Sequence, residues 1–371
     1  MELLSNILHR QIPSSDPSSP KTPPLPPLNM SPPQSPLFRI EPIPNAGRGV
    51  IATQTIPQGT SLLQSDPPAA HVIFRQYRKE VCALCFHYDL GRTLSVRHAA
   101  TGKVFCSAKC QTRWLEEQGE LGVRASGNVH AFVLARSKDA ANADSYECLP
   151  DRGGRPSAEA VASVWWDGEV ERSRERERNG GKKPGRSNSS NTGNRVLVDP
   201  DVLSFLLSSI LHYHRDLDLW LKKVQALARD PSPYRSTHEL SVYRDSFHQL
   251  RLLLPPVLQQ VCKPQTCHLA VAAASHNSFG IRSEDGEEYM GYALYPEASY
   301  FNHSCAPNVA KVRVGRRWVF SAEREIGAGE ECCITYLGGE ERELDVRERR
   351  ARLREHWGFE CMCVRCRVES P

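Results

Sequence analysis

The stretch YFNHSCAPN, residues 300–308, places amide, imidazole, hydroxyl and thiol groups within nine residues. A buried core strand would not tolerate so many polar groups, because each one would need its own hydrogen-bond partner. An ordinary surface loop has no need of a cysteine and a histidine so close together. The composition of this stretch therefore predicts a binding loop, and the rest of the chain has to indicate what is bound.

The chain has 371 residues, which is room for about two domains. Its hydrophobic content of 40% and six Trp predict a sizeable core. Residues 1–37 are rich in Pro and Ser, so we expect a disordered leader there. This leader lacks the basic start and apolar run of a signal peptide. No stretch approaches the roughly 18 apolar residues that span a membrane, and no membrane partner is expected.

The net charge of +4 comes from a single tract. Residues 171–195 hold eight Lys or Arg and three Glu, a net +5, so the rest of the chain carries −1. We predict a disordered basic insertion over residues 150–195; the alternative is a nuclear-import or nucleic-acid patch around Lys182, Lys183 and Arg186. Because the remainder is near neutral, no nucleic-acid partner is expected.

Hydrophobic patterns indicate the main elements. Short β-branched runs broken by Gly and Pro predict strands and turns after residue 37. Helical spacing predicts one helix over 201–227 and another over 237–254, the second stopped by Pro255 and Pro256. Toward the C-terminus we expect strands at 309–314, 316–322 and 332–336, followed by a charged helix over 340–357 in which Val346, Leu353 and Trp357 share one face.

Thirteen cysteines without a secretory signal favour metal sites over disulfides. Cys82 and Cys85 form a C-x2-C pair, and Cys106 and Cys110 form a C-x3-C pair. Four thiolates in two short chelating pairs suit tetrahedral zinc, because each pair spans one edge of the tetrahedron with little strain. The spacing predicts one zinc ion that organises its own insert.

A second cysteine cluster, CMCVRC, supplies Cys361, Cys363 and Cys366. A closed structural zinc site needs a fourth ligand. His356 is a candidate by proximity in sequence, and Cys305 from the opening stretch is the alternative. Spacing alone leaves both open. Cys262, Cys267 and His268 have near-ligand spacing without an evident fourth partner, and we expect them in the core.

Several motifs together resemble the SET-domain protein-lysine methyltransferases. The cysteine insert, with FCSAKCQTRW at 105–114, resembles a MYND zinc finger, and SHNSFGI at 275–281 strengthens the similarity to the SMYD-type subgroup and its small fungal relatives. The motifs that carry the resemblance occur in the family's order: AGRGVIATQTIPQGT (46–60), NHSCAPN (302–308), GEECCITY (329–336) and GFECMCVRC (358–366).

The resemblance implies an α+β protein: a SET-domain β fold with a pseudoknot, a MYND-like zinc insert, a helical insert and a post-SET zinc cluster. The implied domains are the leader (1–37), the N-terminal part of the SET domain (38–81), the zinc insert (82–118), a connecting segment (119–149), the basic insertion (150–195), the helical insert (196–262), the catalytic C-terminal part (263–338) and the helix with the post-SET zinc region (339–371).

Matching positions also imply the site residues. Tyr336 matches the catalytic tyrosine, and Cys305 matches the ligand that completes the Cys361, Cys363 and Cys366 zinc site, which favours it over His356. The residues implied to bind S-adenosylmethionine are Gly47, Arg48, Asn277, Asn302, His303 and Phe359, and those implied to bind two zinc ions are Cys82, Cys85, Cys106 and Cys110 in the insert and Cys305, Cys361, Cys363 and Cys366 in the post-SET cluster.

These residue types suit methyl transfer to lysine. Glycines let backbone approach the cofactor, and Asn and His can anchor it by directional hydrogen bonds. Lysine must first lose a proton, at a cost of about 4 kcal/mol at neutral pH given its pKa near 10.4. A desolvated aromatic channel beside a positive sulfonium lowers this cost, and alignment of the nitrogen with the methyl group supplies much of the rate.

The chain departs from the family pattern at two points. The cysteines of a second zinc site in the MYND finger are missing, so we expect one zinc ion there. The sequence stops at Pro371, just after the zinc cluster, so we expect substrate selection by the SET face and the inserts.

The expected partners are a histone or non-histone protein with an exposed lysine and SH3- or WW-type domains on the Pro-rich leader; the expected state is a monomer in nucleus and cytoplasm. The competing hypothesis is a non-catalytic scaffold.

Overall fold

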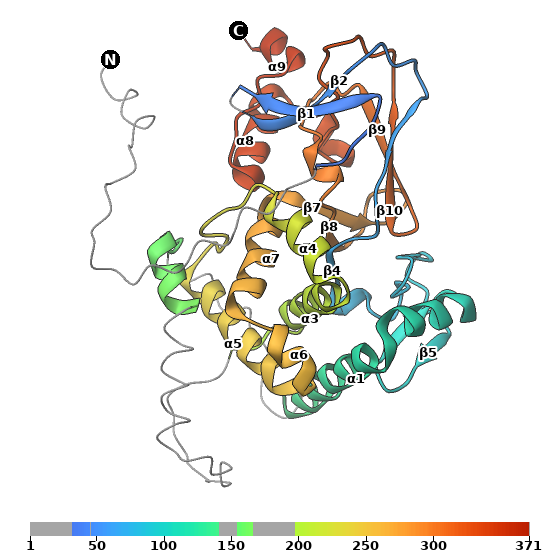
Figure 1. Ribbon diagram of the computed structural model, residues 1–371, viewed down its shortest axis with the longest axis vertical. Helices are drawn as coiled ribbons and strands as arrows, with labels where there is room; N and C mark the ends of the chain where they lie inside the picture. The colour runs from blue at the N-terminus through green and yellow to red at the C-terminus, as the bar shows by residue number, and fades with distance from the viewer. Residues whose placement is uncertain (1–31, 45, 141–153, 166–196, 371) are drawn as a thin grey trace.

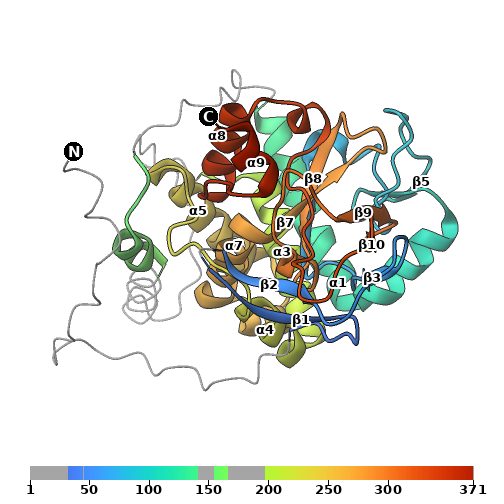
Figure 2. The same ribbon diagram turned by 90° about the horizontal axis from the view of Figure 1, so that it is seen from above.

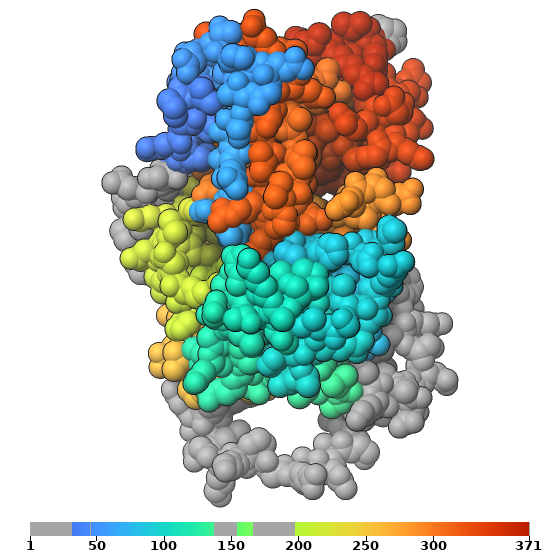
Figure 3. Space-filling view, turned by 90° about the vertical axis from the view of Figure 1, so that its right-hand side faces the viewer, coloured from blue at the N-terminus to red at the C-terminus, as the bar shows by residue number. Residues whose placement is uncertain are grey.

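The chain folds around four small antiparallel sheets, as seen in a computed structural model that describes residues 32–44, 46–140, 154–165 and 197–370. Figure 1 shows most of the sheets and the C-terminal helices at one end and the long helices at the other. In Figure 3 the N-terminal strands lie against C-terminal segments, and the zinc insert with the start of the longest helix forms a region of its own below them. The predicted α+β class is confirmed.

Strands from the two ends of the sequence pair with each other. β1 (Phe38–Ile43) pairs with β2 (Gly47–Ala52). Two three-stranded sheets have the orders β3 (Ser61–Gln64), β10 (Arg317–Ala322), β9 (Val309–Val314) and β4 (Ala70–Ile73), β8 (Tyr289–Leu294), β7 (Ser278–Arg282). The fourth sheet, β5 (Val96–His98) with β6 (Lys103–Phe105), lies in the zinc insert. The N- and C-terminal parts of the SET region therefore form one unit, although more than 200 residues separate β4 from β7 in the sequence.

The helices occupy the inserts and the C-terminus. The long helix α1 is kinked at Gly119, whose φ of 60° and ψ of 178° are not helical, and it crosses the predicted boundary between zinc insert and connecting segment. The helices are α1 (Ala108–Ala140), α3 (Pro200–Arg215), α4 (Leu217–Gln225), α5 (Thr237–Leu253), α6 (Pro256–Val261), α7 (Pro264–Asn277), α8 (Val346–Trp357) and α9 (Val364–Glu369), with short 3-10 turns η1 (Arg75–Tyr77), η2 (Ala298–Tyr300) and η3 (Gly339–Arg342).

The prediction of one helix over 201–227 is wrong, because two helices occupy this range. Asp216 leaves the helical conformation at φ −150° and ψ 84°, and its side chain accepts a hydrogen bond from Leu219 N at 3.1 Å, which starts α4. The second predicted helix is confirmed: α5 ends at Leu253, and α6 begins at Pro256. In α8, Val346, Leu353 and Trp357 share one apolar cluster, as predicted.

Part of the tract predicted to be disordered is ordered. Residues 158–165 are helical, with Val161 and Trp165 buried. The indole of Trp165 donates to Tyr234 Oη at 2.8 Å, which docks this turn on the helical core. Two apolar residues four positions apart were the signal that composition masked. The remaining residues of that tract and most of the Pro-rich leader lie outside the described residues.

Two apolar cores support the molecule. One is helical and joins α3, α5 and α7 to β4; the other fills the space between the sheets and includes Phe301 and Phe320. Figures 1 and 2 both show α8 and α9 side by side near the C-terminus, over a smaller cluster that holds the post-SET cysteines. Within the described ranges, no helix has the length and apolarity to cross a bilayer.

The predicted strand over 332–336 forms only isolated bridges. Ile334 pairs in parallel with His303, and its neighbours make no regular ladder. This irregular backbone carries the predicted catalytic tyrosine away from the sheet, so the departure from regular structure coincides with the site.

Gly291 on β8 tests the packing of the sheets. A Cβ there would lie 2.0 Å from Val72 O, and its φ of +157° disfavours other residues. We expect Gly291→Ala to destabilise the protein by at least about 2 kcal/mol in urea unfolding, because β4 and β8 would have to separate. The control Gly327→Ala should cost far less, since its Cβ would meet only an ordinary contact at 3.9 Å. Equal stabilities of the two variants would contradict this packing.

Candidate active site and metal centres

The predicted binding loop crosses the segment that carries Tyr336. Ile334 N donates to Asn302 O at 2.9 Å, and Ser304 N donates to Ile334 O at 2.8 Å. A little further on, Asn308 Nδ2 donates to Glu331 O at 2.8 Å, and its Oδ1 accepts from Cys333 N at 2.8 Å. These bonds hold two segments about 30 residues apart side by side, as the predicted pseudoknot requires.

Tyr336 is held at both ends. Its backbone N donates to His303 Nδ1 at 2.9 Å, and its hydroxyl donates to Phe301 O at 3.1 Å. Burial raises the pKa of Tyr336 well above its ordinary value, and the negative charge of Glu331 raises it further. The hydroxyl therefore stays protonated at any physiological pH and acts as a hydrogen-bond donor and acceptor rather than as a phenolate.

Aromatic rings surround Tyr336. The ring centroids of His303, Trp357 and Phe359 lie 5.3, 5.4 and 6.3 Å from its own. Trp357 and Phe359 come from the end of α8 and the turn that follows it, where Gly358 adopts a left-handed φ of 75°. The structure thus brings the predicted Phe359 to the site. The role of Trp357 was missed, because its helical spacing predicted only packing.

The imidazole of His303 is fully used by neighbouring groups. Because Nδ1 accepts from Tyr336 N, the proton lies on Nε2, which donates to Cys305 Sγ at 3.2 Å. Burial lowers the pKa of His303 to about 4, so the ring is neutral. His303 therefore positions Tyr336 and a cysteine of the post-SET cluster. Its contact with the cofactor stays a prediction.

The other residues implied to bind the cofactor gather around η2. Arg48 stands over the ring of Tyr300, with its guanidinium carbon 5.0 Å from the centroid, and Asn302 Nδ2 donates to Arg48 O at 3.2 Å. Asn277 is tied to the same region, because its carbonyl oxygen accepts from Ser299 Oγ at 3.4 Å. Three motifs far apart in sequence thus meet at one place.

A loop that sequence reasoning missed completes this region. The guanidinium of Arg48 donates to Ala226 O, and Asn277 Nδ2 donates to Ala228 O at 2.8 Å. The loop follows α4 in the helical insert, and its contribution comes from backbone carbonyls. No side-chain motif in the sequence could have predicted this loop's contribution, because every residue supplies a backbone carbonyl.

The donor set here fits an amino-acid-bearing cofactor such as S-adenosylmethionine. Glu331 Oε1 accepts from Asn302 Nδ2 at 2.9 Å, so a carboxylate and an amide lie together, as an ammonium group requires. Gly47 has a φ of +75°, and a Cβ there would meet no atom within 4 Å, so the turn leaves space beside Arg48. Glu331 was not predicted as a site residue, although it stands in the quoted GEECCITY motif.

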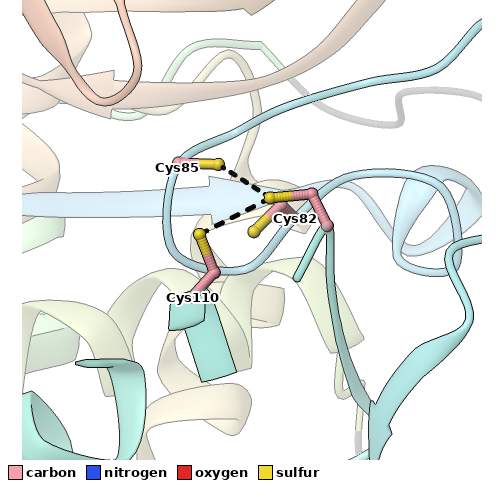
Figure 4. Close-up of side chains that lie close together, drawn as sticks. Cys82, Cys85 and Cys110 are labelled. Carbon is pink, nitrogen blue, oxygen red and sulfur yellow. Dashed lines mark hydrogen bonds between the residues drawn. The ribbon is translucent and has the colours of Figure 1, made fainter. Parts of the chain in front are cut away.

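The first metal centre is formed by the predicted cysteine pairs. The sulfur atoms of Cys82, Cys85, Cys106 and Cys110 all lie within 4.8 Å of one another. Cys106 Sγ lies 3.5 Å from the sulfurs of both Cys85 and Cys110. A tetrahedral zinc site with Zn–S bonds of about 2.3 Å has S–S edges of about 3.8 Å, so this arrangement fits zinc. Figure 4 shows Cys82, Cys85 and Cys110 pointing toward a common centre.

The second centre joins the predicted loop to the C-terminus. Cys305 Sγ lies 3.9 Å from Cys361 Sγ and 3.5 Å from Cys366 Sγ, and all four sulfurs, with Cys363, lie within 4.8 Å of one another. These distances also match the edges of a zinc tetrahedron. His356 is exposed and belongs to neither cluster, so Cys305 is the fourth residue.

Arg349 supports the second centre from α8. This arginine is 1% exposed, and its guanidinium lies 3.8 Å from Cys366 Sγ while pairing with Glu369. A cation beside four thiolates offsets the negative charge that they would carry around zinc. The predicted core cysteines Cys262 and Cys267 are buried away from both centres, as expected.

A cavity of about 990 Å³ lies elsewhere. It opens between the zinc insert, α1 and α3, and its walls include His71, Lys103, His130 and His212. None of the residues implied to bind the cofactor or to carry catalysis lines it. The chemistry of the site therefore follows from the converging motifs rather than from the size of this hollow.

Fold and site together define a SET-domain protein. The family model of the SET domain matches residues 47–337, and the chain belongs to this family. The resemblance found in the sequence is thereby confirmed.

Named relatives agree with this assignment. The chain is 26% identical to "Potential protein lysine methyltransferase SET6" of Saccharomyces cerevisiae over 90% of its own length and 96% of that protein. It is 42% identical to "Histone-lysine N-methyltransferase SMYD3" of Mus musculus over 27% of its length and 23% of that protein. Among solved structures, the chain is similar to the SET domain of LSMT bound to lysine and AdoHcy. The match covers 88% of this chain and 53% of the LSMT chain, at 14% identity and a TM-score of 0.24.

Zinc content distinguishes the two candidates for the fourth ligand. We expect Cys305→Ser to lower bound zinc from two ions per chain to one, because the post-SET cluster loses a thiolate and serine is a poor zinc ligand. His356→Ala, the matched control, should retain two ions. Elemental analysis of the purified variants by mass spectrometry measures both. Two zinc ions in Cys305→Ser would exclude this ligand set.

Proposed function

We propose that the protein is a protein-lysine N-methyltransferase that transfers a methyl group from S-adenosylmethionine to a lysine side chain. The observation that carries this proposal is the position of Tyr336. It lies beside the crossing of the two SET motifs, with its hydroxyl protonated and buried among aromatic rings. Its neighbours on the other side of the crossing, Asn302 and Glu331, present the polar groups that suit the cofactor.

The residues at the site have separate tasks. When bound, the cofactor would supply a methyl group on a sulfonium for transfer to the lysine nitrogen, while the lysine proton would pass to water. Arg48, Asn277, Asn302 and Glu331 would hold and orient the cofactor, and Gly47 would leave room for it. Cys305, held by zinc with the other post-SET cysteines, would fix His303 and through it the backbone of Tyr336.

The aromatic surroundings of Tyr336 act on the substrate. Removing the proton of a free lysine at neutral pH costs about 4 to 5 kcal/mol. Trp357, Phe359 and Tyr336 exclude water from the amine and so disfavour its charged form. The Tyr336 hydroxyl, which donates its hydrogen to Phe301 O, can then accept a hydrogen bond from the neutral amine and so hold the amine lone pair toward the methyl group.

Further properties are proposed from the names of the relatives and from the composition of the chain. The substrate is a protein, either a histone or a non-histone protein, in keeping with the names of the relatives. We also propose that the enzyme is a monomer present in nucleus and cytoplasm. SH3- or WW-type domains would bind its Pro-rich leader. The composition of the leader and of the basic tract supports these proposals.

Methyl transfer from radiolabelled S-adenosylmethionine into histones and into a whole-cell lysate tests the activity. We expect Tyr336→Phe to lower kcat by about 10- to 100-fold, because the hydroxyl that orients the amine is lost. Binding of S-adenosylhomocysteine, measured by calorimetry, should remain. Tyr88→Phe, which removes a hydroxyl in the zinc insert, serves as the control with wild-type activity.

Two outcomes would count against the enzyme. Absence of label in every fraction, from protein that contains zinc and binds the cofactor, would favour the non-catalytic scaffold. Equal labelling by wild type and Tyr336→Phe would show that another residue carries the reaction.

A further inference from the structure

Lys311 is a cation on the inner face of a sheet near the site. It lies on β9 opposite Phe320 of β10, and paired residues of antiparallel strands point to the same side. Phe320 is fully buried, so the lysine side chain also points inward. Its ammonium lies 5.6 Å from the ring centroid of Phe279 and 5.8 Å from that of Trp318.

This ammonium has no anionic partner. Among the described residues, no carboxylate lies within ion-pair distance of Lys311 Nζ, and no acceptor forms a hydrogen bond with it. Burial, together with the charges of Arg342 and Arg282, lowers the pKa of Lys311 to about 8. The group is still mostly protonated at neutral pH. The two aromatic rings stabilise it only in part, because a cation–π contact does not neutralise the charge.

Two arginines share this neighbourhood. The guanidinium carbon of Arg282 lies 3.9 Å from the position of a Cβ on Gly338, two residues after Tyr336. Arg342, in η3, follows four residues later and is exposed. Arg282 donates to Gly286 O at 3.0 Å and stands over the ring of Tyr289, and neither arginine has an ion pair in the part of the chain described.

The nearby carboxylates are engaged by other groups. Glu341 Oε2 accepts from Gly338 N at 3.2 Å, and Asp285 accepts from the Ser283 hydroxyl and from Glu287 N. They cap turns of the backbone and pair with none of the three cations. The three cations therefore form a positive group, without counter-ions, next to the segment that carries the predicted catalytic tyrosine.

We propose that Lys311, Arg282 and Arg342 form a subsite for a carboxylate of the substrate, and that the enzyme therefore prefers target lysines flanked by Asp or Glu. This inference rests on the proposed methyltransferase function. Lys311 is the inner member, held against the adjacent rings of Phe279 and Trp318, and the arginines at the surface admit carboxylates from a polypeptide. The ligand is an acidic peptide segment of a protein, because the target lysine would lie at Tyr336 and Arg282 lies against Gly338, only two residues further along the chain.

Matched peptides test the subsite. The probes are lysine-centred peptides that carry Glu at one of the two positions on either side of the lysine, paired with peptides that carry Gln there. We expect wild-type kcat/KM for transfer from radiolabelled S-adenosylmethionine to be about tenfold higher for the best Glu peptide than for its Gln partner. This ratio should fall with added salt, because screened charges attract less.

Variants assign the preference to the cations. In Lys311→Met, which keeps an apolar side chain against the rings, the Glu-to-Gln ratio should fall to about 3 or less. Arg282→Gln should also lower the Glu-to-Gln ratio, and it replaces Lys311→Met as the test variant if Lys311→Met fails to fold. The matched control Arg352→Gln removes an exposed charge of α8 outside the subsite and should leave ratio and rate unchanged.

The outcomes separate this inference from the proposed function. Efficient labelling of both peptide sets at equal rates would overturn the subsite and leave the methyltransferase standing. A Glu preference that survives both substitutions would assign it to other residues and also overturn the proposal. If no peptide and no lysate protein is labelled, the proposed function fails, and the subsite with it.

Discussion

The crossing of residues 302–308 with residues 329–336 is the constraint on which the rest of the site depends. Its backbone bonds fix Asn302 on the side of the cofactor residues, while His303, one residue later, reaches Tyr336 and Cys305. Such irregular backbone has little stability of its own, because it lacks a regular ladder. The zinc cluster offsets this by tying Cys305 to the C-terminal cysteines, so that metal binding and site geometry are coupled.

This coupling explains why polar groups are so dense in a short stretch. Asn302 bonds Arg48 O and Glu331, His303 bonds Tyr336 N, and Cys305 joins the thiolate cluster. The hydroxyl of Ser304 bonds Ala306 within the loop itself. Asn308 closes the crossing with bonds to both Glu330 and Glu331. A buried polar network is stabilising only when all its members are satisfied, and here nearly every member bonds within the crossing itself.

The sequence predicted the parts of the site whose chemistry resides in side chains. The cysteine pairs follow from their residue type and spacing, whereas Tyr336 and the choice of Cys305 over His356 follow from the resemblance to the SET-domain family. The loop at Ala226 and Ala228 could not be predicted, because it acts through backbone carbonyls. Trp357 was assigned to packing alone, because one helical face can both pack on a core and line a site. The break at Asp216 was missed because an N-cap inside an apolar run competes with a periodicity that continues past it. The ordered turn at Trp165 was hidden by the polar composition around it.

Charge balance links the substrate subsite to the reaction. A carboxylate next to a target lysine stabilises its ammonium form and raises its pKa, which opposes methylation. If that carboxylate pairs with Lys311 and the arginines beside it, its effect on the amine is largely cancelled. Lys311 already lowers the pKa of His303, whose ring adjoins that of Tyr336. Such an enzyme gains affinity from an acidic residue beside the target lysine. It also avoids the cost that this residue would add to deprotonation of the lysine. Cations without counter-ions therefore suit this side of the site.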